Sequence, residues 1–314
     1  MACTIIAECC QNHNGDLEIL KRMIHAAAGA GADYAKIQGL RSTELAYRER
    51  FECGEVDADG TVRTITRPFA AERERLSRLD LSDEDEAWFV EECRRAGIRS
   101  MITAFTRGST ARFAAAGFDA VKVASYDCRS VPLLCEVAAG FGEVYVSTGA
   151  SYDDEIVRAA GVFRPGQLAM LHCVTIYPTP LDQLHMRRMG WLRGIVGRVG
   201  FSDHTKPSET GLRASMLALA EGAEVLERHF TVLEPTATRD GPVSIDPARL
   251  RRLRAFADLA PEERRAALAA EWPEWEVGLG LAQRELSPAE LLNRDYYAGR
   301  VAAWVDGRQL PNDQ

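Results

Sequence analysis

Eight short runs of β-forming residues, separated by stretches of helical pattern, constrain the fold of this chain more than any other feature. Most side chains in these runs are apolar, as expected for strands covered on both faces. The runs cover residues 4–8, 33–38, 98–105, 120–125, 144–148, 168–174, 199–204 and 225–231. Strands that alternate with helices indicate parallel βα units, and eight such units predict an α/β fold of the closed (β/α)8, or TIM, barrel type.

The segment after the first run argues against an open, doubly wound sheet. Such a sheet carries a Gly-rich phosphate-binding turn there, whereas this chain reads CCQNHNG at 9–15. Helical patterns cover 17–30, 82–96 and 209–221, and Ser82 is the expected N-cap of the second. The barrel is therefore the predicted architecture.

The chain has 314 residues, of which 46% are hydrophobic, and this suits one large core. We expect a catalytic barrel domain over 1–260 and a short C-terminal helical and β-like extension over 261–314. After the last strand, helical patterns cover 247–260, within the domain, and 261–272, within the extension, which ends in a β-like remnant at 296–314. Residues 39–80 are charged and Arg-rich. They are predicted to form a loop or lid over the site, with a disordered surface insertion as the alternative.

Composition excludes several classes of partner. A formal net charge of -8 argues against nucleic-acid or anionic-membrane binding, which would require a basic face. The eight cysteines show no zinc-like spacing and are expected to be reduced. No apolar run is long enough to span a membrane and the N-terminus has no charged leader, so we expect a soluble, cytoplasmic protein.

Lysine is rare, and three of the four lysines lie at or near strand ends. Lys36 closes the second run, Lys122 lies in the fourth, and Lys206 follows the seventh, whereas Lys21 lies in a helical pattern. A compact ammonium group at such a place can bind a phosphate or carboxylate, with ordinary surface ion pairing as the alternative. Hydroxyl groups at equivalent positions along neighbouring predicted strands could complete a phosphate-binding site. These are Thr103, Ser125, Ser147, Thr148 and Ser202.

Two histidines end neighbouring strands of the predicted barrel, His204 in the seventh run and His229 in the eighth. Together they could bind one divalent cation that keeps open positions for substrate and water, and Glu8 on the adjacent first strand could join it or activate a water. Buried, hydrogen-bonded histidines are the alternative. His25, His172 and His185 are expected to be structural or solvated, and the role of His13 stays open.

Several segments, in this order, resemble the sialic acid synthase family. They are IIAE at 5–8, NHNGD at 12–16, GADYAKIQ at 31–38, VYVSTG at 144–149, LHC at 171–173, YPTP at 177–180, FSDHT at 201–205 and LERHFT at 226–231. Members of this family condense phosphoenolpyruvate with an N-acylmannosamine or a related sugar. The resemblance implies a metal-dependent synthase and a homodimer.

The resemblance also assigns roles to individual residues. His204 and His229 would bind Mn2+ or Mg2+. Phosphoenolpyruvate would be bound by Lys36, Thr103, Lys122, Ser125, Ser147 and Ser202, while Glu8, Gln38 and Tyr177 would face the acceptor. We expect Glu8, His204 and His229 to be the catalytic residues. The implied reaction adds the enol carbon of phosphoenolpyruvate to the acceptor aldehyde, adds water and releases phosphate. Its product is a 2-keto-3-deoxy sugar acid.

Three departures from the family pattern concern the acceptor side. We expect no full C-terminal antifreeze-like domain, whose arginine reaches into the partner's active site in the family, because residues 296–310 resemble only its beginning. The loop at 240–247 is shortened and reads Gly-Pro-Val where the family has Gly-Pro-Asp, so Asp240 is the expected replacement for the sugar-binding aspartate. Thr175 stands where the family has Asn or Ser. We therefore expect an atypical aldose or other aldehyde as the acceptor.

Two alternatives remain at this point. A pyruvate aldolase or lyase would use a Schiff-base lysine or a metal-bound enolate and would release no phosphate. A non-catalytic paralogue would bind a sugar phosphate or partner an active synthase. The presence of His204, His229, Lys36 and Lys122 argues against the second alternative.

Overall fold

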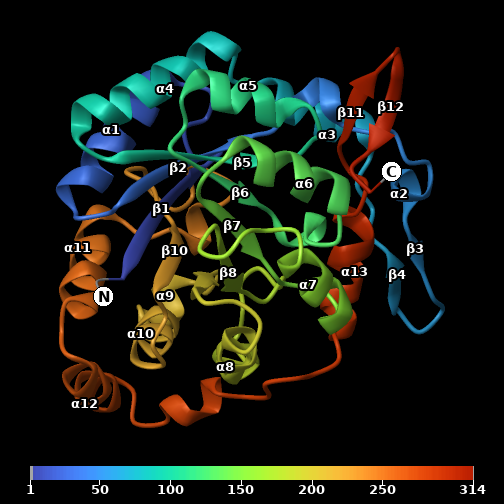
Figure 1. Cartoon of the computed structure of the whole chain (residues 1–314). Coiled ribbons are helices and arrows are strands. Elements are labelled where there is room, and N and C mark those ends of the chain that lie inside the picture. The colour runs from blue at the N-terminus through green and yellow to red at the C-terminus, as the bar shows by residue number, and fades with distance from the viewer. Residues whose placement is uncertain (1–2, 314) are drawn as a thin grey trace.

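Eight parallel strands close into a barrel in the computed structural model, which describes residues 3–313 (Figure 1). The strands neighbour one another in the order β1-β10-β9-β8-β7-β6-β5-β2. Their bounds are β1 (Thr4–Cys10), β2 (Tyr34–Gly39), β5 (Arg99–Ala104), β6 (Ala120–Val123), β7 (Val144–Ser147), β8 (Leu168–His172), β9 (Val199–Asp203) and β10 (Val225–His229). Each coincides with one of the eight predicted runs, so the predicted barrel is confirmed.

Alternating side chains along each strand divide the core into two parts. On β1, Ile5, Ala7 and Cys9 pack in the layer between strands and helices, while Ile6 faces the barrel interior with Tyr34 and other residues. This period of two follows from the strand geometry. Strand residues therefore pack either against the helices or inside the barrel.

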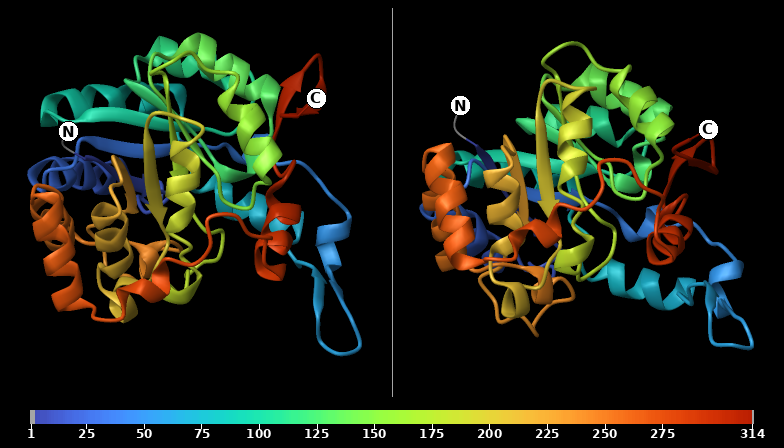
Figure 2. Two further views of the ribbon diagram at one scale, coloured as in Figure 1. Left: turned by 60° about the horizontal axis from the view of Figure 1, so that its bottom comes forward. Right: turned by 90° about the horizontal axis from the view of Figure 1, so that it is seen from below.

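Helices surround the barrel on the outside (Figures 1 and 2). They are α1 (Leu17–Gly29), α4 (Asp83–Ala96), α5 (Ser109–Ala116), α6 (Val131–Gly140), α7 (Asp153–Ala160), α8 (Arg187–Arg193), α10 (Arg213–Ala220), α11 (Pro247–Ala257) and α12 (Pro261–Glu271). As predicted, Ser82 caps α4, since its hydroxyl accepts a hydrogen bond from the backbone N–H of Asp85 (3.1 Å). The single helix predicted over 209–221 is wrong, because Gly211 at φ +60° separates α9 (Pro207–Thr210) from α10. His185, expected in a helix, precedes α8 with φ +52°.

Residues 39–80 are more ordered than a loop. They form η1 (Ser42–Glu44), α2 (Arg50–Cys53), the hairpin of β3 (Glu55–Val56) and β4 (Val62–Thr64), and α3 (Phe69–Ser77). The hairpin projects away from the barrel (Figure 2). Leu40, Leu45 and Leu76 form a small separate core with Val301, so this segment is held by the C-terminal part of the chain. The disordered insertion considered from the sequence is not what the structure shows.

The C-terminal part contains α13 (Pro288–Tyr297) and the hairpin of β11 (Ala302–Val305) and β12 (Arg308–Pro311), drawn in red (Figure 1). The hairpin contacts η1, because Trp304 Nε1 donates to the carbonyl oxygen of Thr43 (2.9 Å). The β-like remnant predicted over 296–314 is confirmed within the described residues, and Gln314 lies outside them. The division into a domain at 1–260 and an extension at 261–314 stays a prediction. Across residues 3–313, every helix is too short or too polar to cross a bilayer.

One partly buried carboxylate joins four strands at the amino-terminal end of the barrel. Glu143, just before β7, accepts hydrogen bonds from Tyr34 Oη, Arg99 Nη2 and Arg198 Nη1, each at 2.7 Å, and from the Tyr145 hydroxyl. Burial raises the pKa of Glu143, but these donors outweigh burial and lower the pKa to about 2. The end of a barrel opposite the active site commonly serves stability.

We expect Glu143→Gln to lower the free energy of unfolding at pH 7 by about 2 kcal/mol, because hydrogen bonds to a charged acceptor contribute about 1.5–3 kcal/mol. The folded pKa is depressed, so the carboxylate stabilises fully above its ordinary pKa of 4.5 and loses this effect as the pH falls towards about 2. Urea unfolding should therefore show a difference from wild type that narrows below about pH 5. The exposed control Glu91→Gln should change stability by less than about 0.5 kcal/mol. A difference that does not depend on pH contradicts this account.

Candidate functional site

A cavity of about 530 Å³ opens at the carboxyl ends of the barrel strands. This is where parallel barrels place their active sites. Twelve of the residues predicted from the sequence line it. They are Glu8, Lys36, Gln38, Thr103, Lys122, Ser125, Ser147, Tyr177, Ser202, His204, His229 and Asp240.

Some candidates lie elsewhere. Thr175 is buried outside the residues that line the cavity, and its methyl group packs beneath Gly149, so the cavity gives no support to its predicted acceptor role. Lys206 lies outside the lining and pairs with Glu209 (2.5 Å), as a surface ion pair does. His13 accepts a hydrogen bond at Nδ1 from the Gly15 backbone (3.0 Å). It therefore anchors the turn after β1.

Two buried lysine–glutamate pairs form the floor of the cavity. Lys36 pairs with Glu8 and donates to Thr103 Oγ1 (2.8 Å). Lys122 pairs with Glu227 (2.9 Å). Burial away from water lowers the pKa of Lys36 to about 7, against the opposing effect of the Glu227 carboxylate. The lysine charges are thus already balanced within the chain before any substrate binds.

Several cavity atoms have no hydrogen-bond partner among the described residues, and Ser147 Oγ, His204 Nδ1 and His229 Nδ1 are among them. Buried polar atoms are usually paired, so unpaired atoms that face a cavity are available to a ligand. The ring centroids of His204 and His229 lie 5.4 Å apart. Both side chains come from the ends of adjacent strands, as predicted.

The histidines suit a metal ion. Burial lowers the pKa of both, and for His204 the neighbouring His229 adds to the effect. Neutral imidazoles are the form that binds a metal. A further group of possible ligands, Cys10, His229 and Asp240, brings its ligand atoms within 4.8 Å of one another. The residues present therefore fit a divalent cation.

Several lining residues were missed by the sequence analysis. Glu227 could have been found, because it lies two residues before His229 on the same strand and so shares its inward face. Gln11 and Tyr126 could also have been found, because they closely follow strands β1 and β6. The others are arginines and tail residues whose segments have no period that predicts where they fold. They include Arg67, Arg75, Arg239, Asn293, Tyr297 and Arg300.

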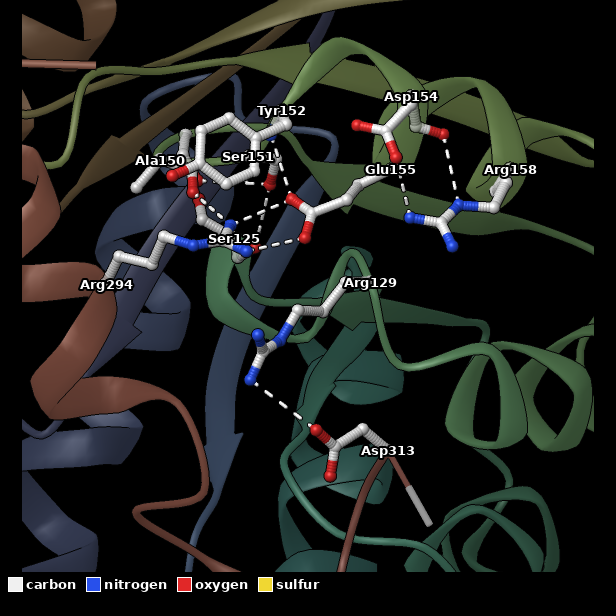
Figure 3. Close-up of polar contacts among 11 residues, drawn as sticks. Ser125, Arg129, Ala150, Ser151, Tyr152, Asp154, Glu155, Arg158, Arg294 and Asp313 are labelled. Atoms are coloured by element: carbon white, nitrogen blue, oxygen red, sulfur yellow. Dashed lines mark hydrogen bonds and ion pairs between the residues drawn. The ribbon is translucent and has the colours of Figure 1, made fainter.

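Helix α13 covers one side of the cavity with Asn293 and Tyr297, and a tether holds it there (Figure 3). Arg294 donates to the carbonyl oxygen of Ala150 (2.7 Å) and pairs with both carboxylate oxygens of Glu155 (2.5 and 2.8 Å). Ala150 and Glu155 follow β7, so the tether joins the tail directly to a barrel loop. The position of α13 is therefore set by a partly buried, bidentate ion pair.

Over most of its length the chain is similar to one group of enzymes. A family model described as the NeuB family matches residues 23–260. The N,N'-diacetyllegionaminic acid synthase of Legionella pneumophila is 31% identical over 261 residues, which cover 81% of this chain and 70% of that protein. The N-acetylneuraminate-9-phosphate synthase of Homo sapiens is 26% identical over 315 residues, which cover 96% of this chain and 78% of that protein.

Solved structures give the same result. The N-acetylneuraminic acid synthetase of Leptospira borgpetersenii, in complex with citrate, matches with a TM-score of 0.69 at 26% identity, covering 94% of this chain and 91% of that one. The resemblance inferred from the sequence motifs is confirmed.

We expect Arg294→Ala to loosen α13 and to lower the free energy of unfolding by about 2 kcal/mol, because it leaves the Glu155 carboxylate without its bidentate partner. Limited proteolysis followed by mass spectrometry should show faster cleavage around residues 285–300. The control Arg158→Ala removes an exposed pair with Asp154 (65% and 72% exposed side chains) and should behave as wild type. Equal cleavage rates in the two variants would exclude a tethering role.

Proposed function

We propose, since the chain belongs to the NeuB family, that it is a metal-dependent synthase that condenses phosphoenolpyruvate with an aldose or another aldehyde, releasing phosphate and a 2-keto-3-deoxy acid. One observation carries the proposal. Lys36 and Lys122, a set of hydroxyls, and the pair His204 and His229 all line a single cavity. Anion-binding groups and metal ligands are what this reaction requires side by side.

Charge balance supports a metal requirement. Lys36 and Lys122 are each paired with a glutamate inside the cavity, so they bring no surplus positive charge. Phosphoenolpyruvate carries a phosphate and a carboxylate, and its burial there calls for further cations. A divalent cation held by His204 and His229 would supply part of that charge. The sequence resemblance predicts Mn2+ or Mg2+ for this position.

In the proposed reaction a C–C bond forms between C3 of phosphoenolpyruvate and the acceptor carbonyl carbon, water adds to C2, and the C2–O bond to phosphate then breaks. The cation, when bound, supplies Lewis acidity at the acceptor oxygen. Lys36, Lys122 and Ser147 would hold the phosphate and carboxylate, with Thr103, Ser125 and Ser202 as further donors. Glu8, beside Lys36, is the proposed base for the attacking water.

An atypical acceptor is also proposed, and an arginine cluster in the cavity supports it. The cluster consists of four lining residues, namely Arg67, Arg75, Arg239 and Arg300. Three of them share one carboxylate, that of Glu72 (2.5–3.5 Å), and Arg67 Nη1 is buried with no hydrogen-bond partner among the described residues. Val243 occupies the position of the family's aspartate. Surplus positive charge favours an acceptor that carries a phosphate or carboxylate.

Two further expectations belong to the proposal. Each of the eight cysteines lies within residues 3–313 and is free, which agrees with a reducing, cytoplasmic location. A homodimer is expected from the family resemblance.

Phosphate release from phosphoenolpyruvate should require both an acceptor and a divalent cation. The screen pairs N-acylmannosamines, mannose and pentoses with their phosphorylated forms, with and without a chelator. We expect His204→Ala and His229→Ala to reduce turnover at least about a hundredfold, because loss of one ligand weakens the binding of the cation and shifts its position. Pyruvate formation or use without phosphate release would instead indicate an aldolase. Ligand binding with no turnover would indicate a non-catalytic paralogue.

Arg67→Ala should raise KM for the preferred acceptor about tenfold and leave KM for phosphoenolpyruvate within about twofold, because one charge-assisted hydrogen bond is worth roughly 1.5 kcal/mol. Steady-state kinetics with each substrate varied in turn measures this split. Arg78→Ala, which removes an exposed pair with Glu74, is the control. A change in KM for phosphoenolpyruvate alone would indicate that the arginine cluster binds phosphoenolpyruvate and not the acceptor.

A further inference from the structure

Cys10 lies at the end of β1, directly beside the proposed cation position. Its side chain is fully buried, and its sulfur lies within 4.8 Å of ligand atoms of both His229 and Asp240. Cys9, the preceding residue, belongs instead to the layer between strands and helices. The two adjacent cysteines therefore occupy different environments.

The backbone at Cys10 is unusual. Its φ of +41° lies in the left-handed region, which favours glycine over residues with a Cβ. A non-glycine residue there is a local cost that the surrounding structure has to offset, and such positions cluster at functional sites. A fully buried thiol in that conformation does not simply fill space.

A second, independent observation points to a ligand at this place. The His229 imidazole is 8% exposed, and its Nδ1 has no hydrogen-bond partner among the described residues. Thiol, imidazole and carboxylate are three of the side chains that bind transition metals, and here they come from β1, β10 and the loop after β10. Two segments far apart in the sequence, the end of β1 and the region of β10 with its following loop, thus converge on one point.

We propose that Cys10, as a thiolate, and Asp240 bind the same cation as His229, with His204 available as a further ligand. The proposal rests on the proposed function only in placing that cation in the active site. On binding, the cation replaces the thiol proton: the S–H bond breaks, a metal–sulfur bond forms, and one proton leaves to solvent.

The ligand set has consequences for metal choice. A soft thiolate with an imidazole selects Zn2+, Co2+ or Fe2+ over the hard ions Mg2+ and Mn2+, which prefer oxygen ligands. The metal preference of this chain should therefore differ from the Mn2+ or Mg2+ expected from the family resemblance. Cys10 then determines which metal supports the reaction.

Cobalt absorption tests the proposal without any substrate. The full chain, freed of metal with a chelator, is titrated with Co2+ alone. Thiolate coordination gives a near-ultraviolet sulfur-to-cobalt charge-transfer band, and we expect one such band per chain that saturates at one equivalent. Zn2+ added afterwards should displace it.

Cys10→Gly is the decisive variant, because glycine suits the positive φ and should leave the circular dichroism spectrum unchanged. We expect it to lose the band and to bind Co2+ at least about tenfold more weakly. Cys9→Ala, a buried cysteine one residue away, is the matched control and should keep the band. Asp240→Asn should keep the band with weaker binding.

The proposal is overturned if Co2+ binds wild type without the band, if Cys10→Gly keeps the band at full strength, or if no Co2+ binds. These results are separable from the proposed function. A wild-type band without phosphate release would remove the synthase proposal and leave the thiolate site. If Mg2+ supports phosphate release equally in wild type and in Cys10→Gly, and no band appears, the thiolate site is removed and the synthase proposal stands.

Discussion

The buried pairing of Lys36 with Glu8 and of Lys122 with Glu227 is the interaction around which the active end of the barrel is arranged. Ionised groups in a low-dielectric interior are strongly destabilising unless each has a well-placed partner. The four residues come from β1, β2, β6 and β10, and only a closed barrel points these strands at a common axis. Closure of the barrel therefore makes the site possible. The pairs in turn disfavour any other pairing register of these strands, because a shifted strand would leave a buried charge without its partner.

The opposite end of the barrel uses the same physics for a different purpose. There Glu143 receives hydrogen bonds from residues of four strands or their ends and holds them in register. At the active end, by contrast, groups such as Ser147 Oγ and His229 Nδ1 have no partner within the described residues. Satisfied polar groups at one end and unsatisfied ones at the other separate stability from ligand binding along the barrel axis.

Sequence reasoning located the eight strands and twelve cavity residues because both depend on local periodicity and on the rule that parallel strands end at one face. It failed where long-range packing decides. The helix α3 within 39–80 depends on contacts with the C-terminal part. The break at Gly211 is a local one, set by a glycine at φ +60° that the helical pattern did not take into account. Arg67 and Arg300 reach the cavity only because the C-terminal part folds onto 39–80, and no residue spacing encodes that contact. The acceptor role of Thr175 stays a prediction, and its side chain lies against Gly149, outside the residues that line the cavity.

The two halves of the site differ in charge for a physical reason. The floor is neutral within the chain because its lysines are deep and would otherwise be uncompensated, whereas three members of the arginine cluster share the single carboxylate of Glu72. The whole chain carries a net charge of -8, so anionic substrates are repelled at long range. Within a Debye length of about 8 Å, however, the arginine cluster dominates the field. Arg300 belongs to this chain's own tail, so an arginine reaches the cavity without any contribution from a partner subunit.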